Sequence, residues 1–192
     1  MIASVKRVRA FTLIELLVVI AIIGILSSIG VVAYNKYSLH AKIGATKDQH
    51  QKIKNFVEAS YGKCSLDPRG GLILKTSTSG CSNCNVLGTM LSPGTIKRAC
   101  HSASNVAYFF AYHFNYSGLK NTYGNFGATG IQIGGDIKDQ CCLAQGSNPV
   151  KGGTYIWGDN NLARIMIKSN VGDTNGSNNY LISYVDWPGA GF

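Results

Sequence analysis

The chain has 192 residues, with 18 Lys and Arg against 9 Asp and Glu. Three of the bases fall within the first ten residues, and the remainder has 15 basic against 9 acidic side chains. The acids are scattered singly, and the sequence contains no G-x-S-x-G, H-E-x-x-H or phosphate-binding G-x-x-x-x-G-K-[ST] motif. Composition and motifs therefore argue against an enzyme.

An apolar segment from Phe11 to Val32 is the first predicted element. It spans 22 residues and is interrupted only by Thr12, Glu15, Ser27 and Ser28. A helix needs ~20 apolar residues to cross a bilayer, so this segment predicts a transmembrane helix. The bases that precede it, Lys6, Arg7 and Arg9, should stay on the cytoplasmic side, so the rest of the chain is expected outside the cytoplasm.

A cleaved secretory signal, cut after Ala33, is the alternative explanation of this segment. The run is longer than the usual apolar region of about 7–15 residues in such signals. A charged Glu15 would also oppose insertion by roughly 2.5–3.5 kcal/mol at a helix centre, so the acid needs a partner.

The bases nearest to Glu15 lie ahead of the segment or beyond it, at Lys36. A cut between Ala10 and Phe11 would create an α-amine about one helical turn from Glu15. The amine of a neighbouring copy could then neutralise this carboxylate. We therefore expect Glu15 to act between subunits.

The basic leader followed by AFTLIELLVVIAIIGIL, within residues 6–34, resembles the N-terminal signal of type IV pilins and type II secretion pseudopilins. The resemblance implies that a prepilin peptidase cuts between Ala10 and Phe11 and methylates the new amine of Phe11. It also implies that Glu15 guides subunit registration. Ala10 stands where the family usually has Gly, and Val32 stands near the position where many filament pilins have Pro.

The resemblance implies a structural subunit of a type IV pilus, a homo-oligomer in a helical filament, handled by the prepilin peptidase and pilus assembly machinery. The subunit would wait as a single-pass protein in a bacterial inner membrane, with its head outside the cytoplasm, and then join an extracellular pilus. A pseudopilin of a type II secretion system is the first alternative. A DNA-binding minor pilin for uptake is the second, since the balance of charge is basic. No cofactor is expected.

After residue 33, apolar residues keep a looser helical spacing that includes Ile53, Phe56 and Val57. This pattern predicts one helix from Phe11 to about Ser60, with Gly62 as its stop and His40 and His50 at solvated positions. The predicted parts are a leader (1–10), a membrane or filament-core helix (11–33), an amphipathic continuation (34–62) and a globular head (63–192).

Strand-like runs follow in the head, and the last three are joined by turn residues that predict an antiparallel meander. With the amphipathic helix covering the apolar face of this sheet, the fold class is α+β. The runs are Leu72–Thr76, Thr129–Ile133, Thr154–Gly158, Leu162–Lys168 and Tyr180–Trp187.

An aromatic segment from Ser104 to Gly118 alternates like a strand but is bounded by residues that cap helices. We favour a short helix with its rings in the core. A platform on which nucleic-acid bases stack would use the same rings.

Six cysteines lie in the exported head, where an even number indicates disulfides with 15 arrangements open. Zinc is the alternative, because Cys81-x-x-Cys84 followed by Cys100-His101 supplies three thiols and an imidazole. The disulfide candidates are Cys64, Cys81, Cys84, Cys100, Cys141 and Cys142.

A polar segment, GDTNGSNN, places oxygen-bearing side chains at Asp173, Asn175 and Ser177. These three are weak calcium candidates, because the spacing does not match an EF-hand loop. A polar hairpin loop is the favoured explanation.

Overall fold

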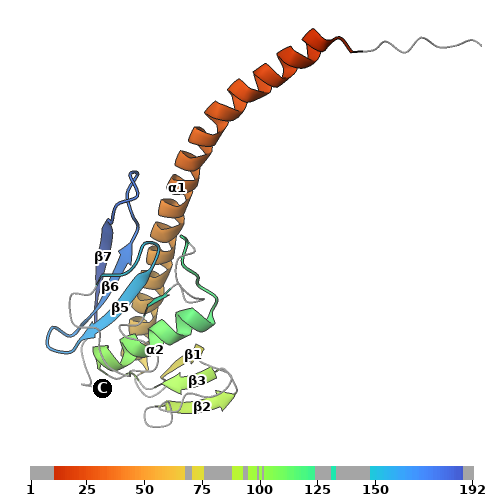
Figure 1. Cartoon of the computed structure of the whole chain (residues 1–192). Coiled ribbons are helices and arrows are strands. Elements are labelled where there is room, and N and C mark those ends of the chain that lie inside the picture. Colours follow the sequence, from red (N-terminus) through yellow and green to blue (C-terminus); the bar gives the residue numbers. More distant parts are fainter. Residues whose placement is uncertain are drawn as a thin grey trace, which may run out of the picture. The chain divides into compact units, whose positions relative to one another are not determined.

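The computed structural model describes residues 11–67, 71–75, 88–92, 95–98, 100, 102–123, 131–132 and 148–187. The chain forms two compact units, Met1–Leu39 and His40–Phe192. Helix α1 (Leu13–Leu66) begins in the first unit and ends in the second, which also holds every other described element (Figure 1).

The first unit consists of the N-terminal part of α1. The predicted apolar segment is helical here, and α1 contains an 18-residue stretch long and apolar enough to cross a membrane. None of that stretch is buried, and the side chains of Phe11 and Leu13 are 81% and 82% exposed. Such an apolar surface needs a bilayer or other apolar helices to cover it.

The second unit begins with the C-terminal part of α1, which carries one buried stripe. Apart from the adjacent Gln49 and His50, its members recur every three or four residues, the spacing of a single helix face. The stripe consists of Thr46, Gln49, His50, Ile53, Val57, Ser60 and Cys64. This part of the helix therefore packs one face against the head, as the predicted fold class requires.

Gly62 was predicted to end this helix, and that prediction is wrong, since α1 runs to Leu66. A glycine costs a helix only about 0.8–1 kcal/mol relative to alanine. The residues around it are held by stronger tertiary contacts. Tyr61 packs against Trp187 with ring centroids 5.7 Å apart, and Cys64 is bonded to Cys100.

The larger sheet has the order β4-β5-β6-β7. Strands β5 (Thr154–Asp159), β6 (Arg164–Asn170) and β7 (Tyr180–Asp186) form the antiparallel meander that the turn residues predict. Strand β4 (Ile131–Gln132) adds a short parallel pairing to β5, with Ile131 opposite Thr154. The predicted α+β class is confirmed.

A second sheet has the order β1-β3-β2 and is antiparallel throughout. Strand β1 (Leu72–Lys75) was predicted, whereas β2 (Gly88–Ser92) and β3 (Thr95–Arg98) were not. Leu74 pairs with Ile96, and both are fully buried. This sheet therefore adds a second apolar surface to the head.

Helix α2 (Ala103–Tyr116) confirms the short helix predicted for the aromatic segment. It begins slightly earlier than Ser104, because the N–H of Val106 already donates to the carbonyl of Ser102. Gly118 has a φ of +86°, and the N–H of Leu119 donates back to the carbonyl of Phe114, as in a Schellman ending.

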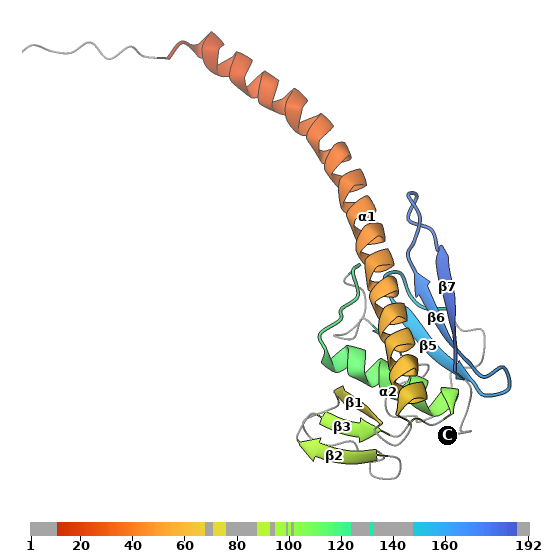
Figure 2. The same cartoon turned by 180° about the vertical axis from the view of Figure 1, so that it is seen from behind.

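The last turns of α1 pack with α2 and both sheets in one core (Figures 1 and 2). Phe110 is fully buried and contacts the rings of Phe56 and Trp187, each at a centroid distance of 5.6 Å. Phe109 and Phe114 are also buried. Burial of these rings supports the core-packing explanation over a stacking platform.

Helix α2 lies directly on β5 where it passes Gly158. A Cβ at this position would overlap the backbone of Ala103 and Ser104, so only glycine permits the close approach. The loop after β5 strengthens the contact, because the Asn160 side chain accepts from the N–H of Ser104 and donates to its hydroxyl.

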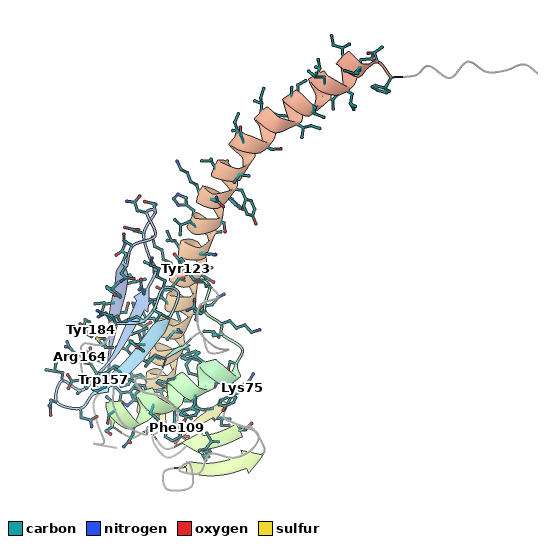
Figure 3. The ribbon with its side chains drawn as sticks, in the orientation of Figure 1. Lys75, Phe109, Tyr123, Trp157, Arg164 and Tyr184 are labelled. Carbon is teal, nitrogen blue, oxygen red and sulfur yellow. A yellow bond between two sulfur atoms is a disulfide. The ribbon has the colours of Figure 1, made fainter. Side chains whose placement is uncertain are left out.

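The outer face of the larger sheet carries aromatic and basic side chains in register. Trp157, Met166 and Tyr184 lie opposite one another on β5, β6 and β7. The guanidinium of Arg164 lies 4.2 Å from the ring centroid of Tyr184, and Figure 3 labels Trp157, Arg164 and Tyr184 on this sheet. Such cation–π pairs stabilise the meander from its solvent side.

His50 was expected at a solvated position, and that prediction is wrong, since its side chain is 1% exposed. Its Nδ1 lies 2.8 Å from the hydroxyl of Ser169 on β6, and its Nε2 lies 2.9 Å from that of Ser183 on β7. Burial, with a smaller contribution from Lys54, lowers the pKa of His50 to about 4. The neutral ring therefore joins α1 to two strands of the sheet.

His113 on α2 is also held neutral. Its Nδ1 accepts from the N–H of Lys75 at 2.9 Å, and its ring stacks on Phe56 at a centroid distance of 4.6 Å. Burial, with a smaller contribution from Lys75, lowers the pKa of His113 to about 4. Both histidines thus favour the folded state only while they are uncharged.

The head should lose stability as pH falls from about 6.5 to 4. In the unfolded chain His50 and His113 have their ordinary pKa and bind protons in this range, whereas in the folded chain they do so only near pH 4. Near pH 5 each of the two contributes a slope of up to about 1.4 kcal/mol per pH unit. Urea unfolding of the full chain in detergent, followed by tryptophan fluorescence, gives this slope. His50→Gln and His113→Gln should each remove the contribution of one histidine from this slope. An unchanged slope in either variant contradicts the conclusion that the histidine is held neutral in the folded head.

Candidate assembly site at the start of the first helix

The sequence places three site residues around the beginning of α1. Ala10 lies outside the described residues, whereas Phe11 and Glu15 are described. The first helical hydrogen bond runs from the N–H of Leu16 to the carbonyl of Thr12, at 3.3 Å. Thr12 is therefore the N-cap, and Glu15 is the third residue of the helix.

Thr12 and Glu15 form a reciprocal capping box. The backbone N–H of Thr12 donates to Oε2 of Glu15 at 2.8 Å, and the hydroxyl of Thr12 donates to the same oxygen at 2.7 Å. In return, the N–H of Glu15 lies 3.3 Å from Oγ1 of Thr12. The box satisfies donors that every helix leaves unpaired in its first turn.

This arrangement corrects the expectation that Glu15 has no partner inside the apolar segment. The partner is Thr12, whose backbone N–H and hydroxyl both donate to the carboxylate. The pattern T-x-x-E in front of an apolar helix is a recognised start signal and would have identified the pair. Thr12 is thus the site residue that the sequence analysis missed.

The carboxylate of Glu15 has one occupied and one open oxygen. Oε2 holds both Thr12 donors, whereas Oε1 has no hydrogen-bond partner among the described residues. A helix N-terminus carries a partial positive charge, which also favours an anion at this place. The site can therefore hold an anionic side chain in an apolar setting and still accept one more donor.

Among the six cysteines, the described residues contain one disulfide, between Cys64 and Cys100. It joins the last turns of α1 to the residues just before α2. The other four candidates, Cys81, Cys84, Cys141 and Cys142, lie outside the described residues, as does His101. The zinc alternative as predicted needs a free Cys100 thiolate, and this bond removes it.

The three calcium candidates lie in the loop between β6 and β7. Oδ1 of Asp173 accepts from the backbone N–H groups of Asn175 and Ser177, at 3.0 and 2.6 Å. This carboxylate oxygen therefore closes a turn, which supports the polar hairpin loop. In the part of the chain that the structure describes, no three His, Cys, Asp or Glu side chains gather as a metal site would require.

Comparison with known proteins gives two kinds of match. A family model described as "Prokaryotic N-terminal methylation motif" matches residues 5–31. Two curated relatives, each described as the type IV major fimbrial protein FimA of Dichelobacter nodosus, one of them from strain VCS1703A, are 34% identical over 85 residues. That match covers 42% of this chain and 52% of each relative. No solved structure gives a significant match.

The chain thus spans about half the length of the curated relatives that it matches. The family model covers the capping box and the apolar part of α1, and it ends before the second unit begins. The two kinds of match confirm the predicted resemblance to the type IV pilin family.

Proposed function

We propose that this chain is a pilin, the structural subunit of a type IV pilus. The observation that carries the proposal is an exposed apolar helix that begins with a capping box inside the residues matched by the methylation motif. A helix with this surface is stable in a bilayer or among copies of itself, and the two settings are those of a subunit before and after assembly.

In this proposal a prepilin peptidase removes residues 1–10 by cutting between Ala10 and Phe11, and the amine of Phe11 is methylated. The apolar helix then holds the subunit in the inner membrane as a single-pass protein, with the head outside the cytoplasm. Assembly machinery moves the subunit into an extracellular filament of identical copies. The disulfide is compatible with an oxidising compartment outside the cytoplasm, and the buried core and two sheets let the head fold there.

The capping box explains how an acid is tolerated while the subunit waits in the bilayer. Hydrogen bonds to a charged group contribute about 1.5–3 kcal/mol each. The two Thr12 donors are therefore comparable with the roughly 2.5–3.5 kcal/mol that a charged carboxylate costs at the centre of a membrane helix. Glu15 lies at a helix end, where that cost is smaller.

The open Oε1 of Glu15 then has a role in assembly. In the filament, the Phe11 amine of a neighbouring copy would reach this oxygen in a medium of low dielectric constant. Such a pair need not raise net stability, but it fixes register, because a misplaced copy leaves a charge unpaired. Glu15 would thus define the axial position of each added subunit.

The proposal predicts the N-terminus of the chain in sheared surface material. Intact-mass and N-terminal analysis should find a chain that begins at N-methylated Phe11, since the peptidase acts before assembly. Chain in whole membranes of a strain without the peptidase, beginning at Met1, is the control. A soluble chain beginning near Tyr34 would instead identify an ordinary secretory signal and overturn the proposal.

The comparisons do not favour the two alternatives. Both curated relatives are described as major fimbrial proteins, and neither description mentions secretion or DNA. In the loop between β6 and β7, the Asp173 carboxylate accepts from the N–H groups of Asn175 and Ser177, which supports a hairpin loop over a calcium loop. The proposed function needs no cofactor and no catalytic residue.

A further inference from the structure

The loop between β6 and β7 contains an acceptor motif that the proposed function does not use. Asn175-Gly176-Ser177 has the N-x-[ST] pattern at which oligosaccharides are attached to asparagine. The sequence contains one other such motif, Asn115-Tyr116-Ser117. The structure separates the two motifs by their surroundings.

The base of the β6–β7 loop is firmly held. The buried side chain of Asn170 donates to the carbonyl of Pro149 and to Oδ1 of Asn178, both at 2.9 Å, and its own Oδ1 accepts from the N–H groups of Gly172 and Asn179. The Tyr123 hydroxyl, labelled in Figure 3, donates to the carbonyl of Val171 at 2.9 Å. The strands therefore present the loop tip from a rigid base.

The tip of the loop is open. Asn175 and Ser177 are exposed, and neither the Asn175 amide nor the Ser177 hydroxyl is hydrogen-bonded within the described part of the chain. Gly176 adopts a φ of +79°, and an added Cβ there would meet only the Nζ of Lys151, at 3.9 Å. Figure 1 shows this loop at the free end of the β6–β7 hairpin. An enzyme and a bulky glycan have room here.

The turn at the tip presents the acceptor. Because Asp173 accepts from the backbone N–H groups of Asn175 and Ser177, both side chains stand on one short turn and neither is used to close it. The carboxylate two residues before the asparagine also gives the tip a negative group that a basic side chain of an enzyme can contact.

The backbone of the second motif lies in regular structure. Asn115 lies in the last turn of α2, where the backbone is helical. The N–H of Ser117 is bonded to the carbonyls of His113 and Phe114. A transferase that needs an irregular, accessible acceptor segment would have to unwind this helix end, whereas the Asp173–Ser177 turn is already outside regular structure.

We propose that Asn175 is an N-glycosylation site of the exported head. The donor class is an oligosaccharide linked through pyrophosphate to a polyprenyl lipid. A bond forms between Nδ2 of Asn175 and the anomeric carbon of the first sugar, and the bond from that carbon to the pyrophosphate oxygen breaks. The lipid pyrophosphate leaves with the electron pair, and one amide proton passes to a base of the transferase.

This inference rests on the proposed function, because the transferase and its lipid-linked donor act on exported segments. A glycan at Asn175 would stand on the hairpin tip away from the buried core, so it can be added after the head has folded. Modification is then compatible with the disulfide and with both sheets.

The test uses full-length chain from membranes and from sheared surface material of the native cells. Tryptic cleavage separates the two motifs, since residues 169–192 contain no Lys or Arg and residues 99–120 carry the other motif. The peptide 169–192 should be heavier by a whole number of sugar residues, with sugar fragment ions, while 99–120 should be unmodified. Asn175→Gln and Ser177→Ala should abolish the added mass, Ser177→Thr should retain it, and Asn115→Gln should not change it.

The outcomes separate this inference from the proposed function. Fibre material whose 169–192 peptide carries no sugar overturns the glycosylation site and leaves the pilin proposal standing. A glycosylated chain that stays in membranes and never enters fibres supports the site and counts against the pilin. A mass increase that survives Ser177→Ala also overturns the proposal, because spontaneous chemistry at Asn175-Gly176 would not need the hydroxyl.

Discussion

Replacing Glu15 by alanine should leave the chain in the membrane but reduce the yield of sheared fibres by about a hundredfold or more. Removing one partner of a buried charge pair costs about 3–5 kcal/mol, and every 1.4 kcal/mol is about a factor of ten in an equilibrium constant. The amine of Phe11 in the neighbouring copy would be left without its carboxylate. Quantitative immunoblots of the sheared and membrane fractions measure the effect.

Matched variants at Thr12 separate the cap from the intermolecular pair. Thr12→Ser keeps the hydroxyl that donates to Oε2 of Glu15 and should assemble normally, whereas Thr12→Val removes this donor and should reduce fibre yield by less than Glu15→Ala does. Glu15→Gln keeps the shape of the side chain but loses its charge, so it should also reduce fibre yield strongly. Normal fibre yield from Glu15→Ala, at equal membrane levels, would contradict the registration role.

Removing the Cys64–Cys100 disulfide, with alanine at both positions, should lower the free energy of unfolding of the head by about 3–4 kcal/mol. The bond joins residues 36 apart in the sequence. On the chain-entropy account a closed loop of this length lies between the ~3 kcal/mol of a 15-residue loop and the ~4.7 kcal/mol of a 100-residue loop. The bond also fixes the last turns of α1 beyond Gly62.

Urea unfolding of the full chain in detergent measures this loss, with tryptophan fluorescence as the signal. Both tryptophans, Trp157 and Trp187, lie in the second unit, and Trp187 is in the core. The control is Ser65→Ala, one residue along the same helix, which removes an exposed hydroxyl and its local hydrogen bond to the carbonyl of Gly62. A double alanine variant with the free energy of unfolding of the native chain would show that the disulfide does not stabilise the head, and would contradict this prediction.

The N-terminal half of α1 and the meander were predictable from local patterns. A long apolar run permits only a helix in an apolar medium, and alternating apolar residues between turn signals define β5, β6 and β7. Glu15 was identifiable because a carboxylate in such a run is costly. Its partner Thr12 is not evident from the pattern of charges, because its backbone and hydroxyl donors compensate the carboxylate without carrying a charge.

The remaining differences depend on tertiary structure. His50 looks solvated in sequence, yet two serine hydroxyls on different strands allow it to be buried, and no local pattern reveals serines more than 100 residues away. Strands β2 and β3 are only five and four residues long, so their sequence patterns are too short to indicate strands. They become strands by pairing with each other and with β1. The choice of Cys64 with Cys100 among the open pairings likewise follows from where α1 ends and α2 begins.

The buried stripe of α1 also determines how the head would bear mechanical load. From Thr46 to Cys64 the helix contacts the head along roughly 27 Å at 1.5 Å per residue. A force along the helix axis would strain the His50 hydrogen bonds, the Ile53 and Val57 packing and the Cys64 bond together, in shear. Resistance in shear is shared among all these contacts, whereas peeling would break them one at a time. In the proposed pilus, a pull transmitted along this part of the helix would therefore leave the head folded at tensions that would open a head attached at a single point.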